Sequence, residues 1–383
     1  MPARNISQKP PFFPDDSLTR RRFLQGTGAI VVGAVGIDGD SFNRRDEVIA
    51  QKAGSSSGQR KEIAVAQEKH KPRFGIQIEP QFGFTYTEVA EIAKEAERLG
   101  FTGLWASDHL FFDARSERRN CLDAWALITA LAPVTTRLHL GTLVTCNSYR
   151  LPSILAKMAA SVDHLSNGRL EFGIGAGWKE MEYRAYGIPF PPVSTRLAQL
   201  EEAVQVIRLL WTEERASFAG KHYHLENAFC APKPVQQPLK MWIGGAGEKK
   251  LLRVVAQYAD GWNMIFGYPL PAVKQKLEVL QHHCDAVGRD FSKIEKSLFI
   301  VACVVENEQE LSKRETAVSQ ALGSGAILQM AQKSGTVGTA ERVAETLRSY
   351  RALGFDYFIA MFPYKQDREM LQRFAETVVP HLG

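Results

Sequence analysis

The neighbouring residues Asp108 and His109 have the side chains best suited to chemistry in this sequence. They follow a short apolar run over residues 101–106, and His109 is the only histidine that directly follows an expected strand. A neutral imidazole can donate or accept a proton near pH 7, and a neighbouring carboxylate can hold a ligand hydroxyl or amide. We therefore predict His109 as a candidate acid–base group; a purely structural histidine is the alternative.

A glycine-rich run lies between an expected strand and an expected helix, and consists of Gly244, Gly245, Ala246 and Gly247. Glycine lets the backbone approach a ligand closely, and a helix start offers unpaired N–H groups to an anion. Phosphate binding and a tight turn between strand and helix are equally consistent with this run. A phosphate site after the fifth strand of a barrel would be unusual without further support.

Alternating glycines end another expected strand, at Gly173, Gly175 and Gly177. The spacing is GxGxG rather than the GxGxxG of a dinucleotide-binding turn, and no acidic residue ends a strand about twenty positions later. We therefore reject a dinucleotide fingerprint. Glycine at these positions is instead expected to leave room for a flat ring.

The cysteines and remaining histidines give little support for a metal site. Five cysteines form no CxxC pair, which argues against both a disulfide framework and a zinc site. His222 and His224 lie in an expected short hairpin, and the run His282, His283 and Cys284 lies on an expected helix where adjacent side chains diverge. We expect no metal.

The elements that position these residues alternate between strand and helix from residue 73 onward. Apolar periodicity predicts eight strands, each followed by helix, and a (β/α)8 TIM barrel with an insertion after the fourth strand closes them most economically. A doubly wound open sheet is the alternative. The expected strands span residues 74–78, 101–106, 138–145, 170–174, 240–243, 262–265, 297–304 and 357–361. The expected helices span residues 86–99, 124–132, 154–165, 197–210, 249–258, 272–287, 308–332, 340–353 and 368–378.

Composition excludes two broad classes of function. The chain has 383 residues and a formal net charge of +5, from 47 basic and 42 acidic side chains. A nucleic-acid-binding protein needs a concentrated basic field, which this balance does not indicate. No stretch of about 18 apolar residues occurs, so stable membrane insertion is not expected.

Residues 1–70 differ from the rest in composition. Arg20, Arg21 and Arg22 precede Phe23 and Leu24, and a weakly apolar, glycine-rich run follows over residues 26–37. This order is typical of an export signal, and the paired arginines resemble the twin-arginine (Tat) type. We predict a signal and flexible linker over residues 1–70, export from the cytoplasm, and a barrel domain over residues 71–383. A disordered basic tail on a cytoplasmic protein is the alternative.

Several segments together resemble the bacterial luciferase-like family of flavin and deazaflavin oxidoreductases. They include AERLGFTGLWASDH at 96–109, LGTLVTCNSYR at 140–150, GIGAGWKEMEYRAYGIPF at 173–190, WIGGAG at 242–247 and ADGWN at 259–263. The resemblance covers residues 73–380 and implies a (β/α)8 barrel that binds FMN or the deazaflavin coenzyme F420 at its C-terminal mouth. The run SDH and the segment at 173–190 look most like the F420-dependent branch.

The resemblance also implies roles for individual residues. Asp108 would contact the deazaflavin ring and His109 would face the reacting carbon. Leu143 and Val144 would form a bulge, often with a non-prolyl cis peptide, that backs the ring, and the run at 244–247 would receive the cofactor phosphate. The implied cofactor-binding set is Asp108, Leu143, Val144, Thr145, Asn147, Gly175, Gly177, Gly244, Gly245, Ala246 and Gly247.

Two positions depart from the sugar-phosphate dehydrogenases of this branch. Trp178 stands where those enzymes have an acidic residue, and Asp113 stands where they have an aromatic residue. Together with Phe111 and Phe112, Trp178 predicts a more apolar substrate site; packing of these aromatic side chains in the barrel rim is the alternative.

Three functions remain open at this stage. The first is hydride transfer between F420 and a small organic substrate, with His109 supplying or accepting the proton. The second is an FMN-dependent monooxygenase that receives reduced flavin from a separate reductase and uses O2. The third is a barrel that binds the cofactor without turnover. The resemblance allows a homodimer, and the substrate and the direction of reaction stay open.

Overall fold

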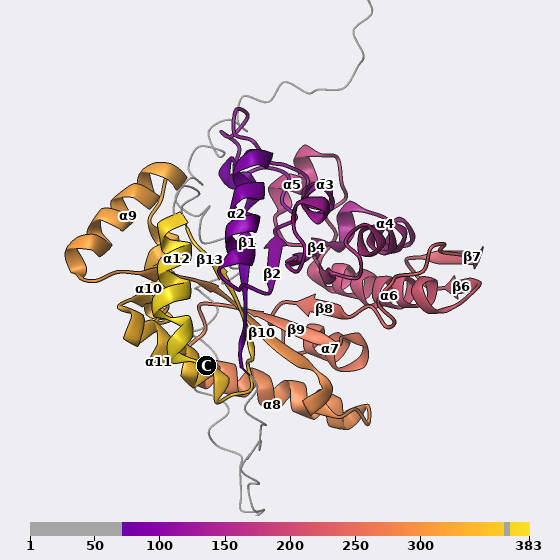
Figure 1. Cartoon of the computed structure of the whole chain (residues 1–383). Coiled ribbons are helices and arrows are strands. Elements are labelled where there is room, and N and C mark those ends of the chain that lie inside the picture. The colour runs from indigo at the N-terminus through magenta and orange to yellow at the C-terminus, as the bar shows by residue number, and fades with distance from the viewer. Residues whose placement is uncertain (1–70, 364–367) are drawn as a thin grey trace, which may run out of the picture.

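The computed structural model describes residues 71–363 and 368–383, so the predicted signal and linker lie outside the described residues. The described part is a barrel of strands surrounded by helices (Figure 1). None of the helices in this part is both long and apolar enough to cross a membrane.

Eight parallel strands close the barrel. Each pairs with the next along the chain, and the last pairs with the first, which confirms the predicted (β/α)8 closure and rules out the open sheet. In order they are β1 (Arg73–Ile78), β2 (Gly103–Ala106), β3 (His139–Thr142), β5 (Leu170–Gly175), β8 (Met241–Gly244), β9 (Gly261–Ile265), β10 (Glu295–Val301) and β13 (Tyr357–Met361).

The helices around the barrel have amphipathic faces and, in several cases, capped N-termini. Thr85 and Glu88 form a capping box at the start of α2, and Gly100 follows that helix in the left-handed conformation with φ 85°. The larger helices are α2 (Tyr86–Arg98), α3 (Ala124–Leu131), α4 (Pro152–Leu165), α6 (Val193–Thr212), α7 (Leu251–Tyr258), α8 (Leu270–Ala286), α9 (Glu308–Leu322), α10 (Ala326–Lys333), α11 (Ala340–Arg351) and α12 (Arg368–Thr377). Short 3-10 helices are η2 (Pro80–Phe82), η3 (Ala132–Val134), η4 (Asn147–Tyr149), η5 (Phe291–Lys293) and η6 (Val379–His381).

The structure corrects the predicted elements in three places. The strand predicted over residues 138–145 is broken into β3 and β4 (Thr145–Cys146). The helix predicted over 308–332 is divided into α9 and α10 because Gly323 takes φ 75° and ends the first helix. The stretch predicted as a strand to residue 304 ends at Val301, and a separate pair of β11 (Cys303–Val304) and β12 (Val337–Gly338) follows.

The predicted insertion after the fourth barrel strand is present. It contains the short helix α5 (Glu180–Ala185) and, after α6, the antiparallel hairpin of β6 (Ala216–Ala219) and β7 (His224–Ala228). His222 and His224 lie in this hairpin, as predicted.

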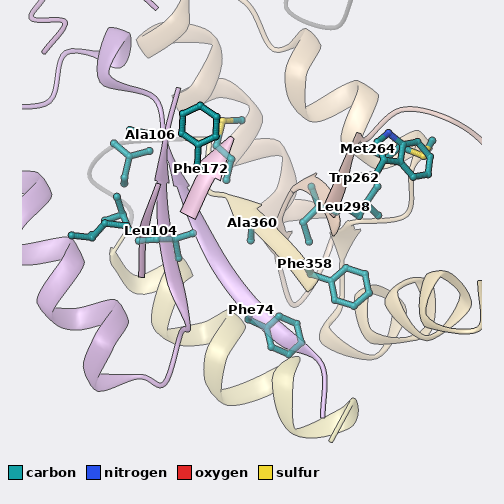
Figure 2. Close-up of a cluster of buried hydrophobic side chains, with 14 of the residues drawn as sticks. Phe74, Leu104, Ala106, Phe172, Trp262, Met264, Leu298, Phe358 and Ala360 are labelled. Atoms are coloured by element: carbon teal, nitrogen blue, oxygen red, sulfur yellow. The ribbon is translucent and has the colours of Figure 1, made fainter. Parts of the chain in front are cut away.

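The main hydrophobic core lies between the strands and the surrounding helices. Phe74, Leu104, Phe172 and Phe358 come from four different strands and are buried in it (Figure 2). The ring of Phe74 contacts Phe374 of α12 at 5.9 Å between centroids. Outward-facing side chains of the strands thus hold the helices in place around the barrel.

A second, smaller core fills the inside of the barrel. It contains Trp105, Trp242, Tyr357 and Ile359, and Trp105 Nε1 donates to Tyr357 Oη at 2.8 Å. The guanidinium of Arg73, at the start of β1, lies over the Tyr357 ring at 4.3 Å from its centroid. Large side chains therefore fill the barrel interior, so a functional site is expected at the strand ends and not inside the barrel.

Candidate functional site

Because all eight strands are parallel, their C-terminal ends and the loops after them gather at one mouth of the barrel. His109 lies there, in the loop after β2, with 18% of its side chain exposed. Its Nδ1 lies 3.0 and 3.1 Å from the two carboxylate oxygens of Glu182 on α5. The rings of His109 and Trp178 meet edge to face, with 5.5 Å between centroids. Among the described residues, Nε2 of His109 has no hydrogen-bond partner.

Glu182 is fully buried and takes several further hydrogen bonds. Its carboxylate accepts from the backbone N–H groups of Leu110 and Phe111 at 3.0 and 3.3 Å, and from Tyr149 Oη at 2.7 Å. Lys179 Nζ lies 3.1 Å away. Burial raises the pKa of this carboxyl, but the hydrogen bond and charge of His109 and the charge of Lys179 outweigh burial and lower the pKa to about 2.

Glu182 was not predicted from the sequence. Glu180 and Glu182 lie two positions apart in the same short segment, and the structure exposes the first while burying the second. The available signal was helical spacing, which groups Glu182 with Lys179 on one face at i, i+3. That spacing indicates that Glu182 and Lys179 share a helix face, but it does not predict that this face contacts His109, which lies 73 positions earlier.

Asp108, the residue before His109, is buried, and its carboxylate accepts several hydrogen bonds. It accepts from Cys146 N at 2.9 Å and from two nitrogens of Arg150 at 2.7 and 3.1 Å. Arg150 also binds Asp123 at 2.7 Å. Burial raises the pKa of Asp108, and the charge and hydrogen bonds of Arg150 oppose that effect. A ring contact by this carboxylate stays a prediction, and it would have to use the remaining acceptor capacity of Oδ1.

The peptide bond between Leu143 and Val144 is cis, as the sequence resemblance implied. The Leu143 carbonyl accepts a hydrogen bond from Gln77 Nε2 of β1 at 3.3 Å. The bulge therefore joins the ends of β1 and β3 across the mouth.

The glycines at the ends of β5 and β8 make room for Val144. A Cβ built on Gly175 would lie 2.7 Å from Val144 Cγ2, and one built on Gly244 would lie 2.8 Å from Val144 Cγ1. Such distances are closer than real Cβ contacts. The expectation that Gly175 leaves space directly for a flat ring is therefore corrected: the side chain of Val144 occupies that space, and any ring would lie beyond it.

Three other predicted residues are placed differently from one another. Thr145 is fully buried, and its Oγ1 forms hydrogen bonds with Thr142 Oγ1 at 2.6 Å and with Trp125 Nε1 at 3.2 Å. These bonds stabilise the bulge. Gly177 has φ 73° and packs against Tyr183. Asn147 donates to Tyr223 Oη at 3.2 Å, while its buried Oδ1 has no partner among the described residues.

The run at 244–247 forms a turn that long-range contacts hold in place. Gly245 has φ 130° and donates to the Asn263 carbonyl at 3.1 Å, and its own carbonyl accepts from Trp262 Nε1 at 2.7 Å. The carbonyl of Ala246 accepts from Lys276 Nζ of α8 at 3.1 Å, and Gly247 stands before α7. Lys276 is 8% exposed and pairs with Glu248 at 2.9 Å, so it brings a positive charge beside this turn; it was not predicted from the sequence.

The free thiols do not form a reactive centre. Burial raises the pKa of Cys146 to about 12, and its Sγ lies 3.1 Å from Tyr183 Oη. Over the part of the chain that the structure describes, no cluster of three or more histidine, cysteine, aspartate or glutamate side chains could hold a metal ion.

Comparison with known proteins finds relatives over most of the chain. A family model described as luciferase-like monooxygenase matches residues 63–357. An F420-dependent glucose-6-phosphate dehydrogenase of Amycolatopsis mediterranei is 28% identical over 320 residues, which cover 77% of this chain and 94% of that protein.

Two solved structures share the fold. An F420-dependent secondary alcohol dehydrogenase in complex with an F420–acetone adduct has a TM-score of 0.71 and 21% identity, over 82% of this chain and all of that chain. A monooxygenase from Streptomyces bottropensis has a TM-score of 0.67 and 21% identity, over 81% of this chain and 98% of that chain. Together with the family match, which spans most of the sequence, these findings show that this chain is an enzyme, an oxidoreductase, and belongs to the luciferase-like monooxygenase family.

Proposed function

We propose that this protein is an F420-dependent oxidoreductase that transfers hydride between the deazaflavin and a small organic substrate. The observation that carries the proposal is His109 at the barrel mouth, with Nδ1 on a buried carboxylate and Nε2 without a partner among the described residues. The F420-dependent relative that aligns with 77% of the chain supports this cofactor.

The residues at the mouth fit a polar, phosphate-bearing cofactor. Asn147 Oδ1 and Gln77 Oε1 are buried without partners among the described residues, and a bound ring with N–H groups would satisfy such acceptors. Val144 would back the ring. The turn at 244–247 would offer backbone N–H groups to a phosphate, and Lys276 beside it, which also pairs with Glu248 at 2.9 Å, would add a positive charge.

The chemistry divides between cofactor and protein. When bound, F420 would supply a two-electron hydride carrier. His109 would move the accompanying proton at Nε2, to or from an oxygen of the substrate. Glu182 and Asp108 would keep the His109 loop in place through the contacts described above.

The wall beside His109 favours an apolar substrate. Trp178 meets the His109 ring and is 40% exposed, and Phe111 stacks on Tyr186 at 6.3 Å between centroids. The nearby ammonium of Lys179 is bound to the carbonyls of Phe111 and Phe112 and to Glu182. We therefore propose small alcohols or ketones with apolar substituents, in preference to sugar phosphates.

An FMN-dependent monooxygenase that uses O2 and a separate reductase is the second candidate. The family description favours it, because it names monooxygenases. The two candidates differ in the cofactor that the protein selects, so cofactor binding separates them.

The test is a parallel titration of the purified protein with F420 and with FMN, followed by quenching of cofactor fluorescence. We expect selective F420 binding, lost in Gly245→Val, because a side chain at φ 130° is strained and would meet Leu251. Gly100→Val is the matched control: it has φ 85° but no atom within 4 Å, and it lies after α2. Selective FMN binding would overturn the proposal and make oxygen uptake the next assay; binding of neither would also count against it.

We propose as well that residues 1–70 direct export by the twin-arginine route. The support is the order of Arg20, Arg21, the apolar run and the polar stretch after it; these residues lie outside the described ones. Fused to a reporter, they should carry it out of the cytoplasm, and the double substitution Arg20→Lys and Arg21→Lys should retain it inside. A reporter that stays inside, or that ignores the substitutions, contradicts the proposal.

A further inference from the structure

The carboxylate of Glu182 makes different contacts at its two oxygens. Oε1 accepts from two backbone N–H groups, those of Leu110 and Phe111, and lies 3.1 Å from Lys179 Nζ. Oε2 accepts from Tyr149 Oη at 2.7 Å, and His109 Nδ1 lies 3.0 Å from Oε2 and 3.1 Å from Oε1. The backbone and lysine donors fix Oε1 as an acceptor, so the orientation of the carboxylate is set by groups other than the histidine.

An ionised carboxylate can only accept hydrogen bonds. Nδ1 of His109 must therefore carry a proton to make its contact with Glu182. In the neutral imidazole the other nitrogen, Nε2, then holds the lone pair and can accept a proton; in the imidazolium it can donate one. Because Nε2 has no partner among the described residues, it is the nitrogen left for a substrate.

We propose that Glu182 is a positioning residue that holds His109 in the Nδ1–H tautomer and aims Nε2 at the substrate. The inference rests on the proposed function for its catalytic consequence. The hold on His109 itself concerns only residues of this chain and can be measured without cofactor.

The geometry makes a specific prediction for Glu182→Gln. The amide oxygen of glutamine must take the place of Oε1, where two N–H groups and Lys179 converge, so its NH2 group takes the place of Oε2. That NH2 would donate to His109 Nδ1, and the proton of the neutral ring would move to Nε2. The substitution should thus swap the tautomer rather than merely loosen the histidine.

The experiment is 15N NMR of histidine-labelled full-length protein without cofactor, at about pH 8–9, above the ordinary imidazole pKa of about 6.5. The signals missing from His109→Gln identify the residue. Wild type should show a protonated Nδ1, and Glu182→Gln a protonated Nε2. Glu180→Gln is the matched control, because Glu180 is exposed on the same helix and pairs with Arg184.

Tyr149→Phe tests whether any loss of a hydrogen bond to Glu182 changes the tautomer of His109. It removes a 2.7 Å hydrogen bond to the same carboxylate and leaves the charge, so the wild-type tautomer should persist. If Glu182→Gln does not fold, the tautomers of wild type and Tyr149→Phe still decide. A neutral wild-type His109 that carries its proton on Nε2 overturns the proposal, and so does a Glu182→Gln variant that keeps both the wild-type tautomer and its turnover.

Steady-state turnover is the second measurement. In Glu182→Gln, kcat should fall roughly 10²-fold, because Nε2 of the neutral ring can no longer accept a proton, while KM for F420 stays near that of wild type. Suppose Glu182→Gln swaps the tautomer but the protein neither binds nor reduces F420. The positioning of His109 by Glu182 would then be confirmed, and the proposed function would be wrong.

Discussion

At the scale of single residues, His109 differs from the other histidines in the contacts that its side chain makes at the barrel mouth. His109 has one nitrogen on a buried carboxylate and the other without a partner among the described residues, beside an exposed tryptophan. His283, by contrast, lies on α8 and contacts the carbonyl of Glu248 through Nε2. Position after a strand end and a buried carboxylate on one ring nitrogen are what single out His109 as an acid–base group.

Replacing His109 by Ala should lower kcat by roughly 10²–10⁴-fold, the range expected when a general acid or base is removed. F420 affinity should change little, because the contacts proposed for its ring and phosphate lie at Val144, Asn147 and the turn at 244–247. Steady-state kinetics and fluorescence titration measure the two quantities separately. His282→Ala, an exposed histidine of α8, is the control. Unchanged turnover in His109→Ala would remove it from the mechanism.

Sequence reasoning could find His109 and Asp108 because both follow directly from a strand end in a parallel barrel. It could not find Glu182 or Lys276. Glu182 reaches His109 across 73 positions, and Lys276 reaches Ala246 across 30, so neither contact leaves a local pattern in the sequence. Their importance arises from where α5 and α8 come to lie, which depends on the packing of the whole barrel.

At the scale of elements, the bulge between β3 and β4 depends on glycines in two other strands. Val144 occupies the space above Gly175 of β5 and Gly244 of β8, so three segments have to be compatible at one point. The core is closely packed, and an added methyl group there has no free volume to enter.

Gly175→Ala should therefore destabilise the protein by about 1–3 kcal/mol, as overpacking does, and weaken cofactor binding. Combining it with Val144→Ala should restore part of the lost stability, because the two side chains compete for the same space. Denaturant unfolding of the single and double variants gives the coupling. Gly247→Ala is the control, since its Cβ would meet only Leu251 at an ordinary 3.6 Å. Purely additive effects would show that Val144 and Gly175 do not compete.

Periodicity predicted the eight barrel strands and most helices, because each is amphipathic or continuously apolar over its length. It predicted one continuous strand across the break at residues 143–144 and one continuous helix across the break at Gly323. The first break was expected only from the resemblance, and its glycine partners lie about 30 and 100 positions further along the chain. The second depends on one left-handed residue, which periodicity does not register.

At the scale of the whole molecule, barrel closure buries polar groups at the end opposite the proposed site. Lys296, in β10, is 9% exposed, and its Nζ donates to the carbonyl of Ile294 at 2.9 Å and lies over the Phe291 ring. Burial lowers the pKa of Lys296 to about 8, although Cys284 and Asp356 oppose that change. An unfolded lysine has a pKa of about 10.4.

The direction of the resulting pH dependence follows from proton binding. Between about pH 8 and 10.4 the unfolded chain keeps a proton on Lys296 that the folded protein has lost, so the free energy of unfolding gains from rising pH in that window. Relative to Lys296→Met, wild type should become more stable by up to about 3 kcal/mol between pH 7.5 and 10.4. Groups such as Cys146, whose pKa burial raises to about 12, act in the opposite direction but are present in both proteins and cancel in the difference. Urea unfolding of both proteins across this range makes the measurement, with Lys274→Met, at an exposed position of α8, as the control. A difference between wild type and Lys296→Met that stays constant from pH 7.5 to 10.4 would mean that Lys296 remains charged in the folded barrel, because the carbonyls of Phe291 and Ile294 stabilise its ammonium more than burial destabilises it.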